Sequence, residues 1–354
     1  MLRLALLALP PFSTDTQRFF ADGLNVAQGK NPYTAPSPVK IEYSHLRSFY
    51  PPLQQIFFGA AVSVFPSPFV FRLCAGFAEL VFLFWFLRRQ FSRAHRLTAT
   101  NQWLAVFLLF NPVSLHEIWR EGHLDHIAAF LLYMAIVNAR AAFAYRRSAL
   151  RRYLYALGAI AFKFYGILAV AFYQQRRSAL RWKRLLDRGF SVFGILCGLF
   201  FLLQFVPALY ITPFAEQGVL VYAQYWHHGN GLVLLFEKFG FAAPHGVYLV
   251  QRGILVAGAI ALSLYLLKKV RYYDALYFSL GSLVVFFPVQ HPWYYFILFP
   301  VILLSPRWRW GMVTVCLLSP LSYLGYFPEY KAIGFVVTTT AWGIFCFTRR
   351  FAYR

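Results

Sequence analysis

Apolar residues along this chain are gathered into long runs, and short segments rich in arginine and lysine separate the runs. An α-helix needs about 20 apolar residues to cross the hydrocarbon core of a membrane. The runs with this character are residues 68–87, 98–115, 125–144, 189–211, 246–267, 275–290, 292–305, 311–327 and 331–348. The pattern predicts an all-α fold, a polytopic transmembrane helical bundle with about ten crossings.

Two segments do not fit a simple crossing. Met1–Phe12 is apolar, but as a helix it rises only about 18 Å, against a hydrocarbon core of about 30 Å. It lacks the small-residue cleavage site of a signal peptide, so we expect an unusually short first helix or a true start further upstream. Residues 51–66 have outer segments on both sides and are predicted to be an amphipathic helix lying at the membrane interface.

A third segment, residues 153–175, has basic clusters on both sides. A single crossing would put one of these clusters on the outer face, against the preference of arginine and lysine for cytoplasmic loops. We therefore predict a re-entrant helical hairpin with Lys163 near its tip. Irregular backbone at membrane depth is tolerated where protein or a wet cavity surrounds it.

Composition supports the membrane assignment, because 60% of the residues are hydrophobic and only 13% are charged. The net charge of +22 comes from tight basic clusters between apolar runs. That placement is typical of cytoplasmic loops and argues against a nucleic-acid partner. The cysteines lie far apart in apolar runs and are interpreted as small buried hydrophobic residues rather than disulfide or metal partners; they are Cys74, Cys197, Cys316 and Cys346.

With the basic clusters inside, the chain forms one integral membrane domain over residues 1–354, with its first outer loop at 13–50 and a second large one at 212–245. Most acids and histidines then fall outside. The outer acids are Asp15, Asp22, Glu42, Glu117, Glu121, Asp125, Glu216, Glu237 and Glu329, and the outer histidines are 45, 116, 123, 126, 227, 228, 245 and 291. Because histidine titrates near neutral pH, this asymmetry indicates a chemical site on the outer face.

The first outer loop places Asp15 directly after the first apolar segment, at the membrane–water boundary. A simpler interpretation is a helix cap, because Ser13 or Thr14 precedes Gln17 at capping spacing. Residues 29–33 read as a turn, and residues 50–53 as a helix start with proline in the first turn.

A second outer cluster, residues 111–126, is rich in charge. Asn111-Pro112 should end a helix, Gly122 should break the next one, and Asp125 should open a third. The simpler interpretation is a helix cap stabilised by salt bridges. A metal site built from His116, His123 and Asp125 is the alternative, but the spacing matches no strong motif, so we expect no metal or other cofactor. The third cluster holds His291 and Trp293, where an interfacial aromatic belt is the simpler interpretation.

Taken together, these motifs resemble the membrane-embedded GT-C glycosyltransferases, and most closely the bacterial polyprenol-phosphate-mannose-dependent mannosyltransferases. The resemblance spans residues 15 to about 305. The matching motifs are Asp15, Arg18-Phe19-Phe20, Asp22-Gly23, Gly29-Lys30-Asn31-Pro32-Tyr33, Tyr50-Pro51-Pro52-Leu53, Asn111-Pro112, Glu117, Gly122-His123-x-Asp125, Lys163 and His291-Pro292-Trp293-Tyr294. The chain departs from the family in its short first helix and in Phe164, which follows Lys163 where a proline is common.

The resemblance implies a glycosyltransferase of the bacterial cytoplasmic membrane, with its active site facing outward. It would move mannose or another hexose from a polyprenyl-phosphate donor to a lipid or glycan acceptor, with inversion. The resemblance assigns Asp15 as the catalytic base. A phosphate leaving group needs no general acid, so one carboxylate suffices. The expected substrate-binding residues are Arg18, Asp22, Tyr33, Glu117, Arg120, His123, Asp125, Lys163, His291 and Trp293.

The carrier phosphate needs cationic groups near the outer boundary. The candidates are Lys163, Arg18, Arg120 and Arg252. Basic residues within a membrane are costly and suggest function, which favours Lys163, Arg252 and Arg72. Each could instead pair with an acid such as Glu79. Two rival functions remain open: a multi-pass transporter or flippase of lipid-linked saccharides, and an oligosaccharide polymerase or ligase. The sequence shows no convincing internal repeat of the kind that transporters often have. Polymerases and ligases typically carry a long late outer loop, whereas the loop richest in chemical groups here is the first one.

Overall fold

The computed structural model describes residues 1–93, 99–141, 146–163, 212–218, 221–222, 280–281, 291–305, 309–326, 336 and 340. Every regular element in those residues is a helix, which confirms the all-α class for this part of the chain. The predicted crossings at 189–211, 246–267, 275–290 and 331–348 lie wholly or almost wholly outside the described residues, as does Arg252.

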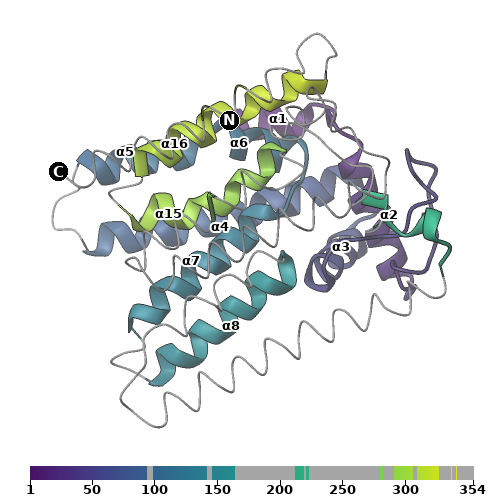
Figure 1. Ribbon diagram of the computed structural model, residues 1–354, viewed down its shortest axis with the longest axis horizontal. Coiled ribbons are helices and arrows are strands. Elements are labelled where there is room, and N and C mark those ends of the chain that lie inside the picture. Colours follow the sequence, from purple (N-terminus) through teal and green to yellow (C-terminus); the bar gives the residue numbers. More distant parts are fainter. Residues whose placement is uncertain are drawn as a thin grey trace, which may run out of the picture. The chain divides into compact units, whose positions relative to one another are not determined.

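The chain divides into two compact units, Met1–Val221 and Tyr222–Arg354. The described helices of the first unit are α1 (Leu2–Ala8), α2 (Asp15–Ala27), α3 (Pro52–Val64), α4 (Pro68–Arg93), α5 (Ala99–Phe110), α6 (Pro112–Ser114), η1 (Leu115–Arg120), α7 (Asp125–Ala141), α8 (Arg146–Phe162) and η3 (Phe214–Glu216) (Figure 1). Those of the second are η4 (Pro292–Leu298), α15 (Phe299–Leu304), α16 (Arg309–Leu318) and η5 (Ser319–Tyr326).

Helix α4 is the one described helix that is long and apolar enough to cross a membrane, through Pro68–Arg88. Its 21 residues rise about 31 Å at the usual 1.5 Å per residue, which matches a hydrocarbon core of about 30 Å. Large apolar side chains are exposed at three- and four-residue spacing along it, at Phe69, Leu73, Phe77, Leu80, Val81 and Phe84. These side chains form a continuous apolar stripe along one face of the helix.

The other predicted crossings that the structure describes are shorter or less regular than expected. Helix α5 has 12 residues and stops at Phe110, because Asn111-Pro112 turns the chain. Helix α7 is described over 17 residues, and the last three residues of the predicted run at 125–144 lie outside the described part. The segment at 292–305 begins with the tighter 3₁₀ helix η4 before α15, and the segment at 311–327 ends in the 3₁₀ helix η5. A bundle of about ten crossings therefore stays a prediction.

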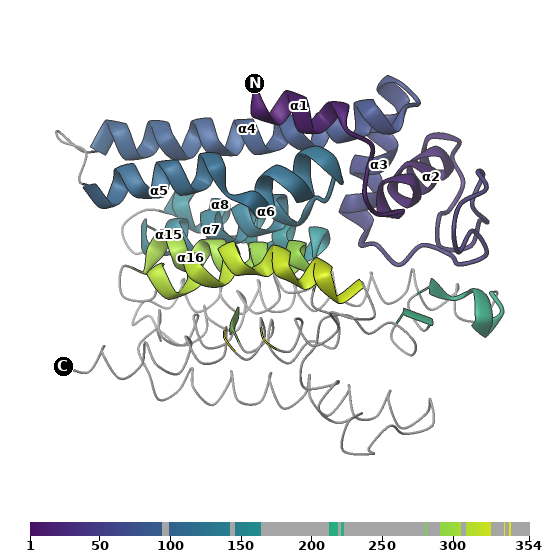
Figure 2. The ribbon, with the colours of Figure 1, turned by 90° about the horizontal axis from the view of Figure 1, so that it is seen from above.

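Helix α1 is short, as predicted, with seven residues, and it lies along α4 and η1 (Figure 2). Nε and Nη2 of Arg3 donate to the two carboxylate oxygens of Glu79 on α4, at 2.9 and 3.1 Å. Nη1 of Arg3 donates to the Leu109 carbonyl, and Nε1 of Trp119 donates to Glu79 at 2.6 Å. The expected partner for Arg72 is thus taken by Arg3, and this buried pair fixes the segment that leads to Asp15.

Helices α2 and α3 pack closely because glycines lie where their backbones approach. A Cβ added to Gly23 on α2 would lie 2.6 Å from the carbonyl oxygen of Phe58 on α3. A Cβ added to Gly59 on α3 would lie 2.4 Å from Val26 on α2. Helix α3 begins at Pro52 with proline in its first turn, as predicted, whereas its place at a membrane interface stays a prediction.

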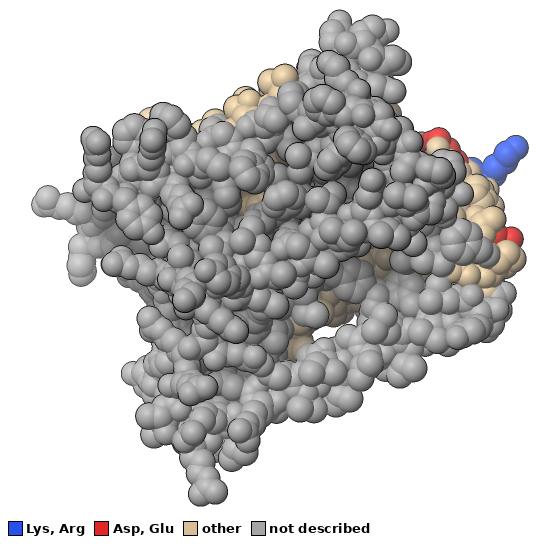
Figure 3. Space-filling view, in the orientation of Figure 1, with Lys and Arg blue, Asp and Glu red and all other residues tan. Residues whose placement is uncertain are grey.

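The connection from α2 to α3 folds back over η3, where the Arg47 amide donates to the Glu216 carbonyl at 2.7 Å and their side chains pair. In the space-filling view, acidic and basic side chains reach the surface along this edge of the described part (Figure 3). The predicted turn at residues 29–33 is confirmed: Gly29 has a φ of +70°, and Oδ1 of Asn31 accepts from the Tyr33 amide.

Helix α8 packs along the length of α7. It begins within the basic cluster at Arg146 and ends at Phe162, so Lys163 stands at its C-terminal end. The helix covers the first half of the predicted hairpin at 153–175; the second half, at 164–175, lies outside the described residues, so the hairpin stays a prediction.

Candidate active site

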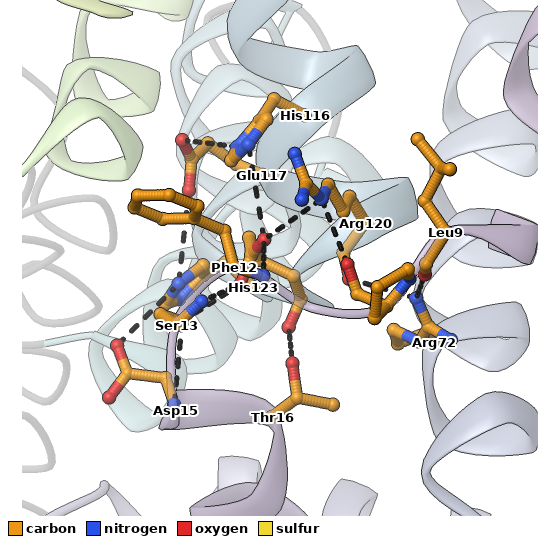
Figure 4. Close-up of polar contacts among 12 residues, drawn as sticks. Leu9, Phe12, Ser13, Asp15, Thr16, Arg72, His116, Glu117, Arg120 and His123 are labelled. Carbon is orange, nitrogen blue, oxygen red and sulfur yellow. Dashed lines mark hydrogen bonds and ion pairs between the residues drawn. The ribbon is translucent and has the colours of Figure 1, made fainter. Parts of the chain in front are cut away.

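Asp15 is the first residue of α2, and its side chain keeps 34% of its surface exposed. Its amide is 3.4 Å from Ser13 Oγ, while Thr14, at the N-cap, makes no side-chain capping bond. The helix start therefore does not use the Asp15 carboxylate as its cap. That carboxylate instead faces the second outer cluster, with Oδ2 at 3.7 Å from Nε2 of His123 (Figure 4).

His123 lies between two carboxylates. Its Nε2 is 3.7 Å from Asp15 and 3.8 Å from Oε2 of Glu117, and its side chain is buried. The other Glu117 oxygen is 3.3 Å from Nδ1 of His116, which is partly exposed. Phe19 packs edge-on against the His123 ring, with 5.2 Å between centroids. Packing thus holds the imidazole beside Asp15.

The local backbone explains how these groups converge. Residues Leu115–Arg120 form a π-helix turn, a wider helix that is frequent at functional sites. Gly122 follows two residues after this turn, and its φ of +78° favours glycine. The chain then turns through His123 into α7 at Asp125. The predicted break at Gly122 and helix start at Asp125 are both confirmed.

Lys163 provides the cation of the cluster. Its Nζ is 3.1 Å from Oδ1 of Asp125, which is buried. The two residues come from the C-terminal end of α8 and the N-terminal end of α7, so the packing of this helix pair brings them together. The positive charge also acts on Asp15, where it opposes protonation.

The pKa of Asp15 is raised to about 6, first by burial against protein and second by the negative charge of Glu121. The charges of Lys163 and Arg18 act in the opposite direction, and that of Asp125 adds to the increase. Burial lowers the pKa of His123 well below 6.5, with a further lowering from Lys163. Around neutral pH, His123 is therefore a neutral hydrogen-bonding group and Asp15 is an ionised carboxylate.

Three predicted substrate-binding residues instead build the first outer loop. The buried guanidinium of Arg18 donates to the carbonyls of Tyr43, Leu46 and Arg47, and its Nε lies 3.8 Å from Asp22. Asp22 accepts from Ser48 at 2.5 Å, and the Tyr33 hydroxyl donates to the Tyr50 carbonyl at 2.7 Å. Burial raises the pKa of Asp22. These contacts show what the side chains hold in place; a direct role in substrate binding stays a prediction.

Arg72 and Arg120 both donate hydrogen bonds to the segment just before Asp15, but they differ in burial. Nη1 of Arg72, which is buried, donates to the carbonyls of Leu9 and Arg120 at 2.7 and 3.1 Å. Arg120 is 25% exposed and donates from Nε to the Pro10 carbonyl at 2.9 Å (Figure 4). Arg120 thus keeps part of its side chain exposed, whereas the buried Arg72 holds backbone carbonyls in place.

His291 and Trp293 belong to the second unit. Their rings are stacked with centroids 4.1 Å apart, and both side chains are buried. Pro292 opens η4, and the hydroxyls of Tyr294 and Tyr222 are 2.6 Å apart. The structure thus groups Asp15, Glu117, His123, Asp125 and Lys163 within the first unit. A role for His291 and Trp293 in substrate binding stays a prediction.

Sequence reasoning gave no specific role to Glu121, which accepts from the Phe12 and Ser13 amides and the Ser13 hydroxyl. The one available signal was an acid directly before Gly122, at the break between two helices. Among the described residues, no three histidine, cysteine, aspartate or glutamate side chains are grouped so as to hold a metal ion. The chain matches no protein-family model, no curated protein and no solved structure with which it was compared.

Proposed function

We propose that the chain is a multi-pass membrane glycosyltransferase of the GT-C type. It moves mannose or another hexose from a polyprenyl-phosphate carrier to a hydroxyl of a lipid or glycan acceptor on the non-cytoplasmic face. The observation that carries the proposal is a difference in solvent exposure among the clustered carboxylates. Asp15 is 34% exposed, whereas the side chains of Glu117, Glu121 and Asp125 are at most 2% exposed. Asp15 is therefore the acid of this group best placed to meet a substrate.

The reaction needs one base. Asp15 takes the proton of the acceptor hydroxyl as that oxygen bonds to the anomeric carbon, and the bond from this carbon to the phosphate oxygen breaks. The polyprenyl phosphate leaves as an anion, so no general acid is required, and the single displacement inverts the anomeric centre. A pKa of about 6 suits this role, because the carboxylate is ionised at neutral pH yet more basic than an ordinary aspartate.

The phosphate needs a cation close to the base. Arg18 and Arg72 are occupied by backbone carbonyls, which leaves Lys163 and Arg120 as the better candidates in the described part of the chain. Lys163 lies close enough to lower the pKa of Asp15. We assign Lys163 to the carrier phosphate, with Asp125 holding its ammonium group in place, because a cation at the leaving group stabilises the charge that develops in the transition state.

The membrane assignment rests on α4 and on the distribution of basic clusters along the sequence. The exposed apolar stripe on α4, from Phe69 to Phe84, would be costly in water and is suited to lipid. Cysteines introduced for Phe77 and Phe84 should resist a membrane-impermeant maleimide in intact cells and react after detergent unfolding. Ready labelling of both in intact cells would contradict a crossing at α4.

The function is tested with purified protein in liposomes that contain radiolabelled polyprenyl-phosphate mannose or glucose and a lipid extract from the source membrane as acceptor. A glycosyltransferase forms a new labelled product and releases polyprenyl phosphate. Movement of the labelled donor between leaflets without a new product would favour the flippase. Activity only with an oligosaccharide donor would favour the polymerase or ligase.

A further inference from the structure

Glu121 contacts the chain on both sides of Asp15. Before Asp15, Oε1 accepts from the Phe12 amide at 2.7 Å, and Oε2 accepts from the Ser13 amide at 2.9 Å and the Ser13 hydroxyl at 2.8 Å. After it, the hydroxyl of Thr16 donates to the Glu121 carbonyl at 2.6 Å. One residue of the second outer cluster therefore holds the start of α2 in place.

We propose that Glu121 is a positioning residue for the reaction, because it fixes the location of the Asp15 carboxylate through these backbone and side-chain bonds. The inference rests on the proposed function, in which Asp15 is the base. It adds a residue that acts through Asp15 without contacting the reacting atoms.

The π-helix turn places Glu121 beside the start of α2. The Glu121 amide donates to the His116 carbonyl and the Gly122 amide to that of Ile118, each at 3.1 Å. The positive φ of Gly122 then turns the chain away, which leaves the Glu121 side chain fully buried against the residues that precede α2. The same turn places His116 and Arg120 beside it, with their nitrogens 3.9 and 3.8 Å from Oε1.

The geometry requires a carboxylate rather than an amide. Donors address both oxygens of Glu121, and an ionised carboxylate can only accept. A glutamine would turn an N–H group toward either the Phe12 amide or the Ser13 amide, and the bond to that amide would be lost. Buried donors left without an acceptor are costly. The negative charge of Glu121 also acts on Asp15, because it is the second largest cause, after burial, of the raised pKa of Asp15.

The test is the Glu121→Gln variant, measured in two ways. Transfer should fall about 100-fold in turnover, because small displacements of a catalytic group have effects of that size. Independently of any substrate, an infrared titration of the Asp15 carboxyl, isolated by subtracting the Asp15→Asn spectrum, should move to lower pH. The charges that remain around Asp15 are Lys163, Arg18 and Asp125, with neutral His123 in contact.

Two control variants separate position from charge. Glu79→Gln alters another buried glutamate that anchors the same N-terminal segment; it should lower stability and leave the Asp15 titration unchanged. Thr16→Val removes one bond to Glu121 but keeps the charge, so it should lower turnover without moving the titration. It also keeps the proposal testable if Glu121→Gln does not fold.

The inference is overturned if Glu121→Gln retains wild-type turnover and titration, or, where that variant does not fold, if Thr16→Val retains wild-type turnover. Failure of the proposed function gives a different result. In that case the wild-type protein transfers no sugar, while the titration of Asp15 still responds to Glu121→Gln.

Discussion

The Nε2 atom of His123 lies 3.7 Å from Oδ2 of Asp15, which sets a buried imidazole against the carboxylate that begins α2. The two residues are far apart in sequence and come from different outer segments. Because His123 is buried and its pKa lies well below 6.5, it contacts Asp15 as a neutral group. It therefore lies against the carboxylate without adding a charge.

This relationship predicts a simple pH profile for sugar transfer. The rate should rise as Asp15 loses its proton, with a midpoint near its pKa of about 6, and His123 should add no second step between about pH 5 and 8. His123→Gln should lower turnover about tenfold through poorer orientation and leave the midpoint in place. The check is turnover against pH for both proteins. Loss of the acidic step in His123→Gln would show that the histidine titrates in this range.

The same pKa predicts how Asp15 affects stability. Because its pKa is raised from 3.8 to about 6 on folding, the folded protein binds this proton more tightly than the unfolded chain. The resulting stabilisation is present below pH 3.8 and is lost as the pH rises through about 6. Asp15→Asn should therefore be more stable than wild type by about 1 kcal/mol near pH 8, a figure reduced for the solvent-exposed third of the side chain.

Thermal unfolding in detergent near pH 8 and below about pH 4 checks this expectation. The stabilisation by Asp15→Asn should vanish at the lower pH, where the wild-type side chain is also neutral. An equal gain at both pH values would assign the effect to packing rather than to charge.

Much of the local structure around the candidate site follows from the sequence. Glycine and proline determine where the helices begin and end. Pro52 opens α3, Asn111-Pro112 ends α5, and Gly122 interrupts the helical backbone before α7. The predicted short first helix also appears as α1. These features depend on backbone constraints within a few residues, which is why pattern reasoning reaches them.

The contacts between segments were beyond the sequence pattern. The sequence around Arg3 does not indicate that Glu79 is its partner. Likewise, the sequence around Arg18 does not indicate that its guanidinium donates to three backbone carbonyls. The sequence predicts an ordinary helix where the π-helix turn at 115–120 lies, because an extra residue in a helical turn leaves no periodic pattern over six residues. Glu121 consequently stood among the outer acids with no distinguishing role.

The close approach of α2 and α3 predicts a strong effect at Gly23. A methyl group there would lie 2.6 Å from the Phe58 carbonyl oxygen and 2.7 Å from Val62, so the helices must separate. Gly23→Ala should lower stability by about 1–3 kcal/mol and lower transfer, because α2 carries Asp15. Gly158→Ala is the matched control, since its methyl group meets only Leu131 side-chain carbon, at 3.1 Å.

Thermal unfolding and transfer should be measured together for the two glycine variants. Gly23→Ala should lose both, and Gly158→Ala should remain close to wild type in both. Comparable behaviour of the two variants would mean that the contact between α2 and α3 does not control the placement of Asp15.

The most direct test of the central claim is transfer from labelled polyprenyl-phosphate sugar by Asp15→Asn, beside Glu42→Gln as a control. Glu42 is an exposed acid of the same outer loop, so the two variants remove equal charge from one segment. Asp15→Asn should fold, insert in the membrane and lose transfer by at least about 100-fold, the contribution expected of a general base, while Glu42→Gln should remain near wild type. Near-normal transfer by folded Asp15→Asn would contradict the assignment of Asp15 as the base.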